Sequence, residues 1–146
     1  MKRILMLFIA ATLAFSCKSA KDTNSKKSTA STSEVSVEKK LQQTWILENL
    51  NGKVVSEKDF SAMPKIVMNS STFSGSTGCN GIKGNLLSKG EKQIQFLNLT
   101  SETKKCDAKK EAEFLQLLRT TSGYSIDNNT LFLSNQFGLT MSFKKG

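Results

Sequence analysis

The sequence predicts a mostly β (α+β) domain, an antiparallel sheet with one amphipathic helix inserted late in the chain. Three observations carry this prediction. Apolar and polar residues alternate over most of the chain beyond residue 41, which is the pattern of half-buried strands. Turn residues interrupt the alternating runs at short intervals. The apolar spacing becomes helical only over residues 107–120.

The first half of the domain is expected to contain five strands. Asn51-Gly52 stands between two apolar runs, which is the strongest short-range hairpin signal. Pro64, the only proline, opens a further apolar run and cannot itself donate to a strand pair. Ile94, Phe96 and Asn98 alternate and are expected on one face. The five strands are expected at residues 43–50, 53–55, 64–69 and, around a turn at 88–90, as two strands within 82–100.

A helix is expected over residues 107–120, with Asp107 as its N-cap and Gly123 as its stop. Beyond it, three closing strands are expected within 123–143. Turn-like residues at 127–129 and 135–138 separate these strands. The stripe expected to be buried on the helix consists of Ala108, Ala112, Leu115 and Leu118, widened by Phe114 and Leu117.

The formal net charge of +9 does not predict nucleic-acid binding, because the positive residues are spread along the chain. Residues 18–40 hold six lysines against three acids, and the chain from residue 41 holds thirteen Lys and Arg against nine acids. Nucleic-acid binding requires a basic stripe with interleaved aromatic residues, and these lysines are single or in pairs. We therefore expect a mixed, solvated surface, no nucleic-acid partner and a monomer.

The N-terminus has the pattern of an export signal. A basic start precedes an apolar run over residues 4–15, which is shorter than the roughly 20 residues that a membrane span needs. The run ends in Ser16-Cys17 and resembles a bacterial lipobox. The resemblance implies that residues 1–16 are a signal peptide cut ahead of Cys17, which then carries diacylglycerol and an acyl chain such as palmitate. The alternative is ordinary signal cleavage, with Cys17 lost or left as a free thiol.

Residues 17–40 are expected to form the lipidated cysteine and a disordered tether, because this Ser, Thr and Lys-rich segment has almost nothing to bury. A plain spacer is favoured over contact of its lysines with anionic head groups, each worth at most about 1 kcal/mol. Lys18, rather than Asp, follows Cys17. We therefore expect a cell-envelope protein anchored in the membrane by lipid, with the outer membrane favoured, on its periplasmic side or at the surface.

Residues 41–146 resemble the META domain family of HslJ-like bacterial lipoproteins. The resemblance implies a strongly bent, barrel-like antiparallel sheet with a helix packed on it. It implies a periplasmic or surface setting and loose links to envelope stress, and it implies no reaction. The matching residues are Thr44-Trp45, Leu47, Leu50-Asn51-Gly52, Pro64, Phe73, Gly75, Gly78-Cys79-Asn80, Gly84, Thr100 or Thr103, Cys106, the helix at 111–118 and the hairpin at 124–133.

Cys79 and Cys106 are expected to form a disulfide. An exported chain enters an oxidising compartment, and once Cys17 is acylated these two are the remaining cysteines. Closing their loop would restrict the unfolded chain by roughly 3–4 kcal/mol. Two reduced, buried cysteines are an alternative. The chain has no histidine, which removes the commonest general base and transition-metal ligand, so we expect no catalytic residue, metal or cofactor.

These features together predict a non-enzymatic, lipid-anchored envelope protein with a binding or structural role linked to envelope stress. Its expected partners are the membrane, through Cys17, and an envelope protein of unknown identity. The alternatives are an inhibitor-like module, an enzyme that uses Glu and Asp, and a thiol-redox protein. A carboxylate pair with a raised pKa in one cleft would favour the enzyme. A labile disulfide would favour the redox protein.

Overall fold

The computed structural model describes residues 38–89, 92–104 and 109–146. The signal peptide, Cys17, nearly all of the tether and Cys106 lie outside the described residues, so the expectations for them remain predictions. Among the described residues, no helix has the length and apolar character that a membrane span requires.

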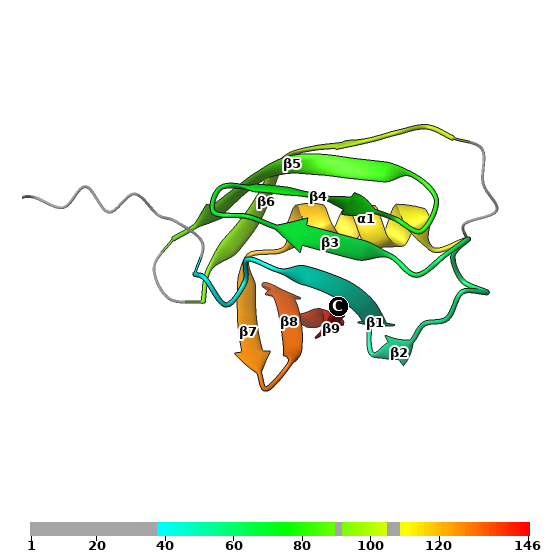
Figure 1. Ribbon diagram of the computed structural model, residues 1–146. Coiled ribbons are helices and arrows are strands. Elements are labelled where there is room, and N and C mark those ends of the chain that lie inside the picture. The colour runs from blue at the N-terminus through cyan, green and yellow to red at the C-terminus, as the bar shows by residue number, and fades with distance from the viewer. Residues whose placement is uncertain (1–37, 90–91, 105–108) are drawn as a thin grey trace, which may run out of the picture. The chain divides into compact units, whose positions relative to one another are not determined.

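Nine strands of the described residues form one antiparallel sheet (Figure 1). Eight follow the order β6-β5-β4-β3-β1-β9-β8-β7, and the two-residue strand β2 lies beside the end of β1. This confirms the mostly β prediction. The strands are β1 (Thr44–Leu50), β2 (Lys53–Val54), β3 (Lys65–Met68), β4 (Thr72–Ser76), β5 (Gly81–Ser88), β6 (Ile94–Ser101), β7 (Gly123–Asp127), β8 (Thr130–Asn135) and β9 (Gly138–Lys145).

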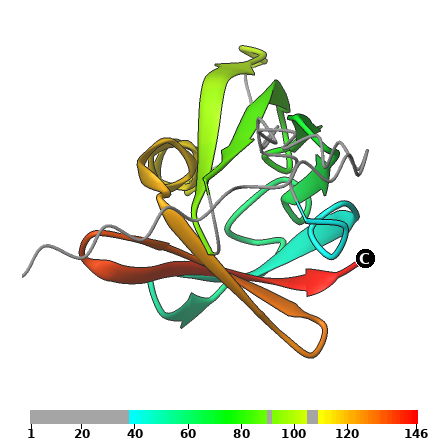
Figure 2. The same ribbon diagram turned by 90° about the vertical axis from the view of Figure 1, so that its left-hand side faces the viewer.

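The sheet curls until its two outer strands approach each other, as Figure 2 shows. Gln93, just before β6, forms an isolated bridge with Gly123 of β7, and the N–H of Tyr124 donates to the carbonyl of Lys92 at 2.9 Å. The sheet does not close beyond this point. Helix α1 (Glu111–Thr120) links β6 to β7 and packs against β6. The expected bent, barrel-like sheet with one helix is therefore confirmed.

Bulges help to bend the sheet, because an extra residue in one strand increases its local twist. The register shifts at Leu47/Asn49, at Lys83/Asn85 and at Leu133/Ser134. Gly84 lies at the second of these register shifts, between Lys83 and Asn85. A Cβ at Gly84 would lie 2.6 Å from a ring carbon of Phe73. Glycine thus lets the Phe73 ring lie directly against the backbone of β5.

The core lies between the curled sheet and α1. Trp45 is fully buried and its indole N–H donates to the carbonyl of Leu41 at 3.0 Å, so its one polar atom is satisfied. Phe114 of α1 meets Phe60 edge-on, with ring centroids 6.3 Å apart, and Phe143 of β9 at 6.4 Å. Aromatic contacts therefore fasten the helix both to the sheet and to the segment that follows β2.

The helix ends at the predicted residue, Thr120, but differs from its prediction at the start. It begins at Glu111 rather than 107, and Lys110 occupies the cap position without a side-chain cap bond. Asp107 and Ala108 lie outside the described residues. The helix ends at Thr120, and Gly123 opens β7 instead of stopping the helix. The predicted stripe is largely confirmed: Phe114 and Leu118 are fully buried, and Leu115 and Leu117 pack partly buried against the core. Ala112, which was also expected in the stripe, is exposed.

The strand predictions fared better. The 43–50 and 53–55 hairpin is confirmed as β1 and β2, and Asn51 and Gly52 both have positive φ, of 48° and 73°. Strand β4 had not been assigned, because its Thr and Ser residues give no clear alternation. The prediction for Asn98 was wrong: it is exposed with a φ of 51°, while Ile94 and Phe96 are buried as expected.

The substitution Gly75→Ala is expected to lower the free energy of unfolding by about 3 kcal/mol. A Cβ at Gly75 would overlap the carbonyl oxygen of Lys65 across the β3–β4 pair. Gly52→Ala adds the same methyl group where no atom lies within 4 Å, at a φ of 73°, and should cost about 1 kcal/mol. Urea denaturation followed by circular dichroism measures both values, and equal losses would contradict the close approach at Gly75.

Candidate functional site

The stretch around Cys79 forms the turn between β4 and β5 at residues 77–80. The N–H of Thr77 donates to the carbonyl of Asn80 at 2.9 Å, and the Thr77 hydroxyl oxygen accepts from the N–H of Asn80 at 2.9 Å. Gly78 has a φ of 92°, and a Cβ there would overlap the carbonyl oxygen of Ala62. Glycine at position 78 therefore permits both the positive φ and the close approach that this sharp turn requires.

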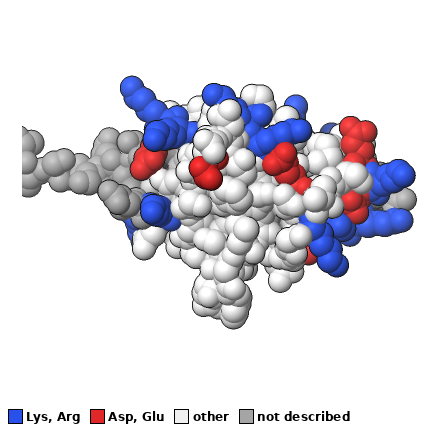
Figure 3. Space-filling model, turned by 90° about the horizontal axis from the view of Figure 1, so that it is seen from below, with Lys and Arg blue, Asp and Glu red and all other residues white. Residues whose placement is uncertain are grey.

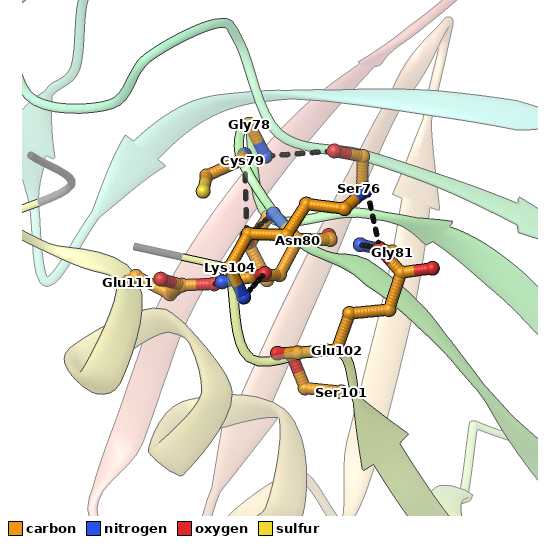
Figure 4. Close-up of polar contacts among 10 residues, drawn as sticks. Ser76, Gly78, Cys79, Asn80, Gly81, Ser101, Glu102, Lys104 and Glu111 are labelled. Carbon is orange, nitrogen blue, oxygen red and sulfur yellow. Dashed lines mark hydrogen bonds and ion pairs between the residues drawn. The ribbon is translucent and has the colours of Figure 1, made fainter. Parts of the chain in front are cut away.

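Asn80 is buried and joins this turn to two other segments, as Figure 4 shows. Its amide nitrogen donates to Glu111 Oε1 at 2.7 Å, and its amide oxygen accepts from the backbone N–H of Lys104 at 2.7 Å. The Thr77 hydroxyl donates to the same Glu111 oxygen at 2.6 Å. We call these four groups the Asn80 network: the side chains of Thr77, Asn80 and Glu111 with the Lys104 N–H.

The Asn80 network also fixes where the helix begins. Glu111 is the first residue of α1, and its carboxylate stands near the positive end of the helix dipole. The cap position lacks a side-chain cap bond, so the start of α1 is determined by this long-range contact rather than by a local signal. The contacts of Thr77 and Asn80 with Glu111 could not be predicted, although Asn80 belongs to the Gly78-Cys79-Asn80 match, because no spacing rule links residues 31 and 34 positions apart.

Two acidic side chains near the Asn80 network, Glu102 and Asp59, each form an ion pair with a lysine. Glu102 Oε2 lies 2.7 Å from Lys104 Nζ and accepts from the N–H of Gly81 at 3.2 Å. The Lys104 bond, followed by the Gly81 N–H, lowers the pKa of the Glu102 carboxyl. Asp59 accepts from the Ser56 N–H at 3.0 Å and pairs with Lys110 at 3.1 Å, and these contacts, in that order, lower its pKa.

Cys79 is half-buried in the turn and is disulfide-bonded in the structure. Its N–H donates to the Thr77 hydroxyl oxygen at 3.4 Å. Cys106 lies outside the described residues, so its pairing with Cys79 stays a prediction. The same holds for the lipid on Cys17.

An open hollow of about 490 Å³ lies beside the Asn80 network. Glu102 and Glu111 both border this hollow, but the contacts of their carboxylates indicate a structural role. A general acid needs a raised pKa, and that of Glu102 is lowered. Glu111 Oε1 already accepts two hydrogen bonds. Within the described part of the chain, no three His, Cys, Asp or Glu side chains gather closely enough to hold a metal ion.

The Asn80 network is expected to contribute strongly to stability through Glu111. Glu111→Ala removes the acceptor shared by Thr77 and Asn80 and should lower the free energy of unfolding by about 2–3 kcal/mol. Glu111→Gln keeps an oxygen acceptor on a side chain of the same length and should cost less than about 1 kcal/mol. Chemical denaturation measures both, and a loss as large for Gln as for Ala would show that the two hydrogen bonds are not the source.

The carboxyls of Asp59 and Glu102 are expected to titrate below their ordinary range in NMR titrations of the folded protein. Because folding lowers each pKa, the stabilisation is complete above the unfolded pKa and is lost as pH falls through the folded pKa. Lys104→Gln should move the pKa of Glu102 upward and leave that of Asp59 unchanged. An unshifted Glu102 in the parent protein would contradict this account.

Comparisons with known proteins agree with this architecture. A solved structure from Burkholderia xenovorans is similar over 72% of this chain and 82% of its own, with 21% identity and a TM-score of 0.58. A DUF4847 family protein from Bacteroides vulgatus is similar over 73% and 94%, with 16% identity and a TM-score of 0.57. At these identities the likeness concerns the fold alone. A search of the curated proteins found no match.

A family model settles the relationship that the residues suggested. The model of the META domain matches residues 38–146, which is well over half of the chain. The matched region contains the whole sheet, α1 and the Asn80 network. The chain therefore belongs to the META domain family.

Proposed function

We propose that the protein is a lipid-anchored component of the bacterial cell envelope whose META domain binds or supports another envelope component without catalysing a reaction. The order of segments carries this proposal. An export signal ends at Ser16-Cys17, a polar tether follows, and the META domain begins at residue 38. The outer membrane is the favoured location, since Lys18 follows Cys17.

The physical role of the lipid is attachment. Each buried methylene contributes about 0.8 kcal/mol, so two or more long chains on Cys17 hold the protein in the membrane for its lifetime. The tether, rich in Ser, Thr and Lys, lets the domain reach components a short distance from the bilayer. Such an anchored domain suits a supporting role under envelope stress.

A binding role draws support from the surface on the β7–β9 side of the domain. Figure 3 looks onto this side and shows a broad face without charged side chains, bordered by lysines and acids. Two large, well-exposed apolar residues lie close together in sequence at the β8–β9 turn and the start of β9: Phe137 (88%) and Leu139 (58%). Neighbouring exposed apolar side chains are more typical of a partner-binding surface than single ones. We propose an envelope protein as that partner.

The residues of the Cys79 turn favour support over catalysis. The carboxylates of Glu102 and Glu111 are engaged in hydrogen bonds that hold the turn, the segment after β6 and α1 together. A thiol-exchange role would need an accessible, labile disulfide, whereas Cys79 is half-buried in a turn fixed by internal hydrogen bonds. We therefore assign Cys79 a structural role, with Cys106 as its proposed partner.

Intact mass spectrometry of the native protein tests the lipoprotein proposal. The expected species begins at Cys17 and carries diacylglycerol with an amide-linked acyl chain. Reduction is expected to add the mass of two hydrogens, as the Cys79–Cys106 disulfide opens. Cys17→Ser should abolish the lipid mass and recovery in the membrane fraction, whereas Cys79→Ser should keep both. An unmodified chain that retains residues 1–16 would overturn the proposal.

A further inference from the structure

Lysines gather where the tether enters the META domain. Lys39, Lys40 and Lys145 border one open hollow of about 510 Å³, whose floor includes the amide side chains of Asn128 and Asn129. These residues come from the start of the described chain, the end of β9 and the β7–β8 turn. Figure 2 shows the start of the described chain near the C-terminus, with the β7–β8 turn below them.

Backbone hydrogen bonds hold the three segments together. The N–H of Lys145 donates to the carbonyl of Asn129 at 2.9 Å, which joins the end of β9 to the β7–β8 turn. The N–H of Gly146 donates to the carbonyl of Thr44 at 2.9 Å, which joins the C-terminus to the start of β1. Backbone hydrogen bonds therefore fix the positions of the segments that form the hollow.

A second hollow of about 240 Å³ lies beside the first and shares Lys40 and Ile126 with it. It adds Lys92, from the segment that precedes β6. We call the four lysines that border the two hollows, Lys39, Lys40, Lys92 and Lys145, the tether-root patch.

Among the described residues, the lysines of the tether-root patch outnumber the acids near it. Glu38 borders the second hollow, and Asp127 is adjacent in sequence to Asn128. In the described part of the chain, the ion pairs join Lys104 to Glu102 and Lys110 to Asp59, so they leave all four patch lysines out. The four lysines are exposed to solvent.

The chemistry of the patch matches a phosphodiester head group. Lysine ammonium groups attract phosphate as point charges, and the Asn128 and Asn129 amides, both exposed, offer N–H donors to its oxygens. Clusters of lysines beside a membrane attachment are the usual signature of attraction to anionic lipid. The patch lies where the tether joins the domain, at Glu38, so the lipid anchor keeps it close to the bilayer and makes weak contacts effective.

We propose that the tether-root patch docks the META domain onto the head groups of anionic phospholipids. The proposal rests on the lipid anchor at Cys17 from the proposed function. It fixes the orientation of the domain: the ends of β7 and β9 that border the patch face the bilayer. The Asn51-Gly52 turn, at the opposite end of β1, points away from the bilayer.

The test measures how fast each lysine is acetylated in the full lipidated protein, reconstituted into phosphatidylcholine vesicles with or without phosphatidylglycerol. With phosphatidylglycerol, the four patch lysines should react about fivefold more slowly, the ratio that corresponds to the attraction of one lysine to an anionic surface. Lys53 and Lys58, beyond the far end of β1, should react equally in both vesicles. High salt should remove the difference. Equal rates for the patch lysines in both vesicles would overturn the proposal.

Two matched double variants distinguish the effect of the tether-root patch from the effect of the protein's net charge. Lys40→Gln with Lys145→Gln should abolish the slowing at Lys39 and Lys92. Lys53→Gln with Lys58→Gln, which removes the same charge elsewhere, should preserve it. Glycerol phosphate added to pure phosphatidylcholine vesicles tests a free phosphate ligand: slowing there, and none with phosphatidylglycerol, would overturn head-group docking. A protein that fails to float with either vesicle refutes the lipid anchor instead, so the two failures are distinguishable.

Discussion

The described fold depends on the satisfaction of one buried amide, that of Asn80. Its two polar ends are bonded to the Glu111 carboxylate and to the backbone of Lys104, which lie in different segments of the chain. A buried amide left without these partners would carry a large desolvation cost, so the β4–β5 turn, the segment after β6 and the start of α1 must come together as a unit. With α1 fixed in this way, Phe114 reaches the core, where it contacts Phe60 and Phe143.

Local signals were sufficient for much of the fold. Asn51-Gly52 dictates its turn within a few residues, and the alternation around Ile94 and Phe96 reports a buried face directly. The end of α1 at Thr120 was predicted, but its start was missed, and the first residue of α1 makes a contact 31 residues away that no short window of sequence contains. Asn98 was misplaced because a bulge in the β5–β6 pair disturbs the alternation. The candidate site was only partly predictable: the sequence marked Gly78-Cys79-Asn80, and the structure added Thr77, Glu111 and the hydrogen bonds of Asn80.

The proposed anchoring of the META domain and its proposed orientation at the membrane both follow from the end of the domain to which the tether is attached. The proposed lipoprotein holds its META domain by one end, and that end carries the lysines of the tether-root patch. The β8–β9 turn with its exposed Phe137, at the other end of β9 from Lys145, then remains open to the proposed envelope protein. Membrane contact and partner contact thus use different surfaces, so both can occur at once.

The tether enters the domain at β1, which is an interior strand of the sheet. Residues 44–46 pair with β3 on one edge, and residues 45–50 pair with β9 on the other. Antiparallel hydrogen bonds run perpendicular to the strands. A mechanical load transmitted from the proposed lipid anchor would therefore act in shear on two rows of bonds together, whereas an outer strand would be peeled away one bond at a time. A domain attached through an interior strand in this way would resist tension between the bilayer and a bound partner.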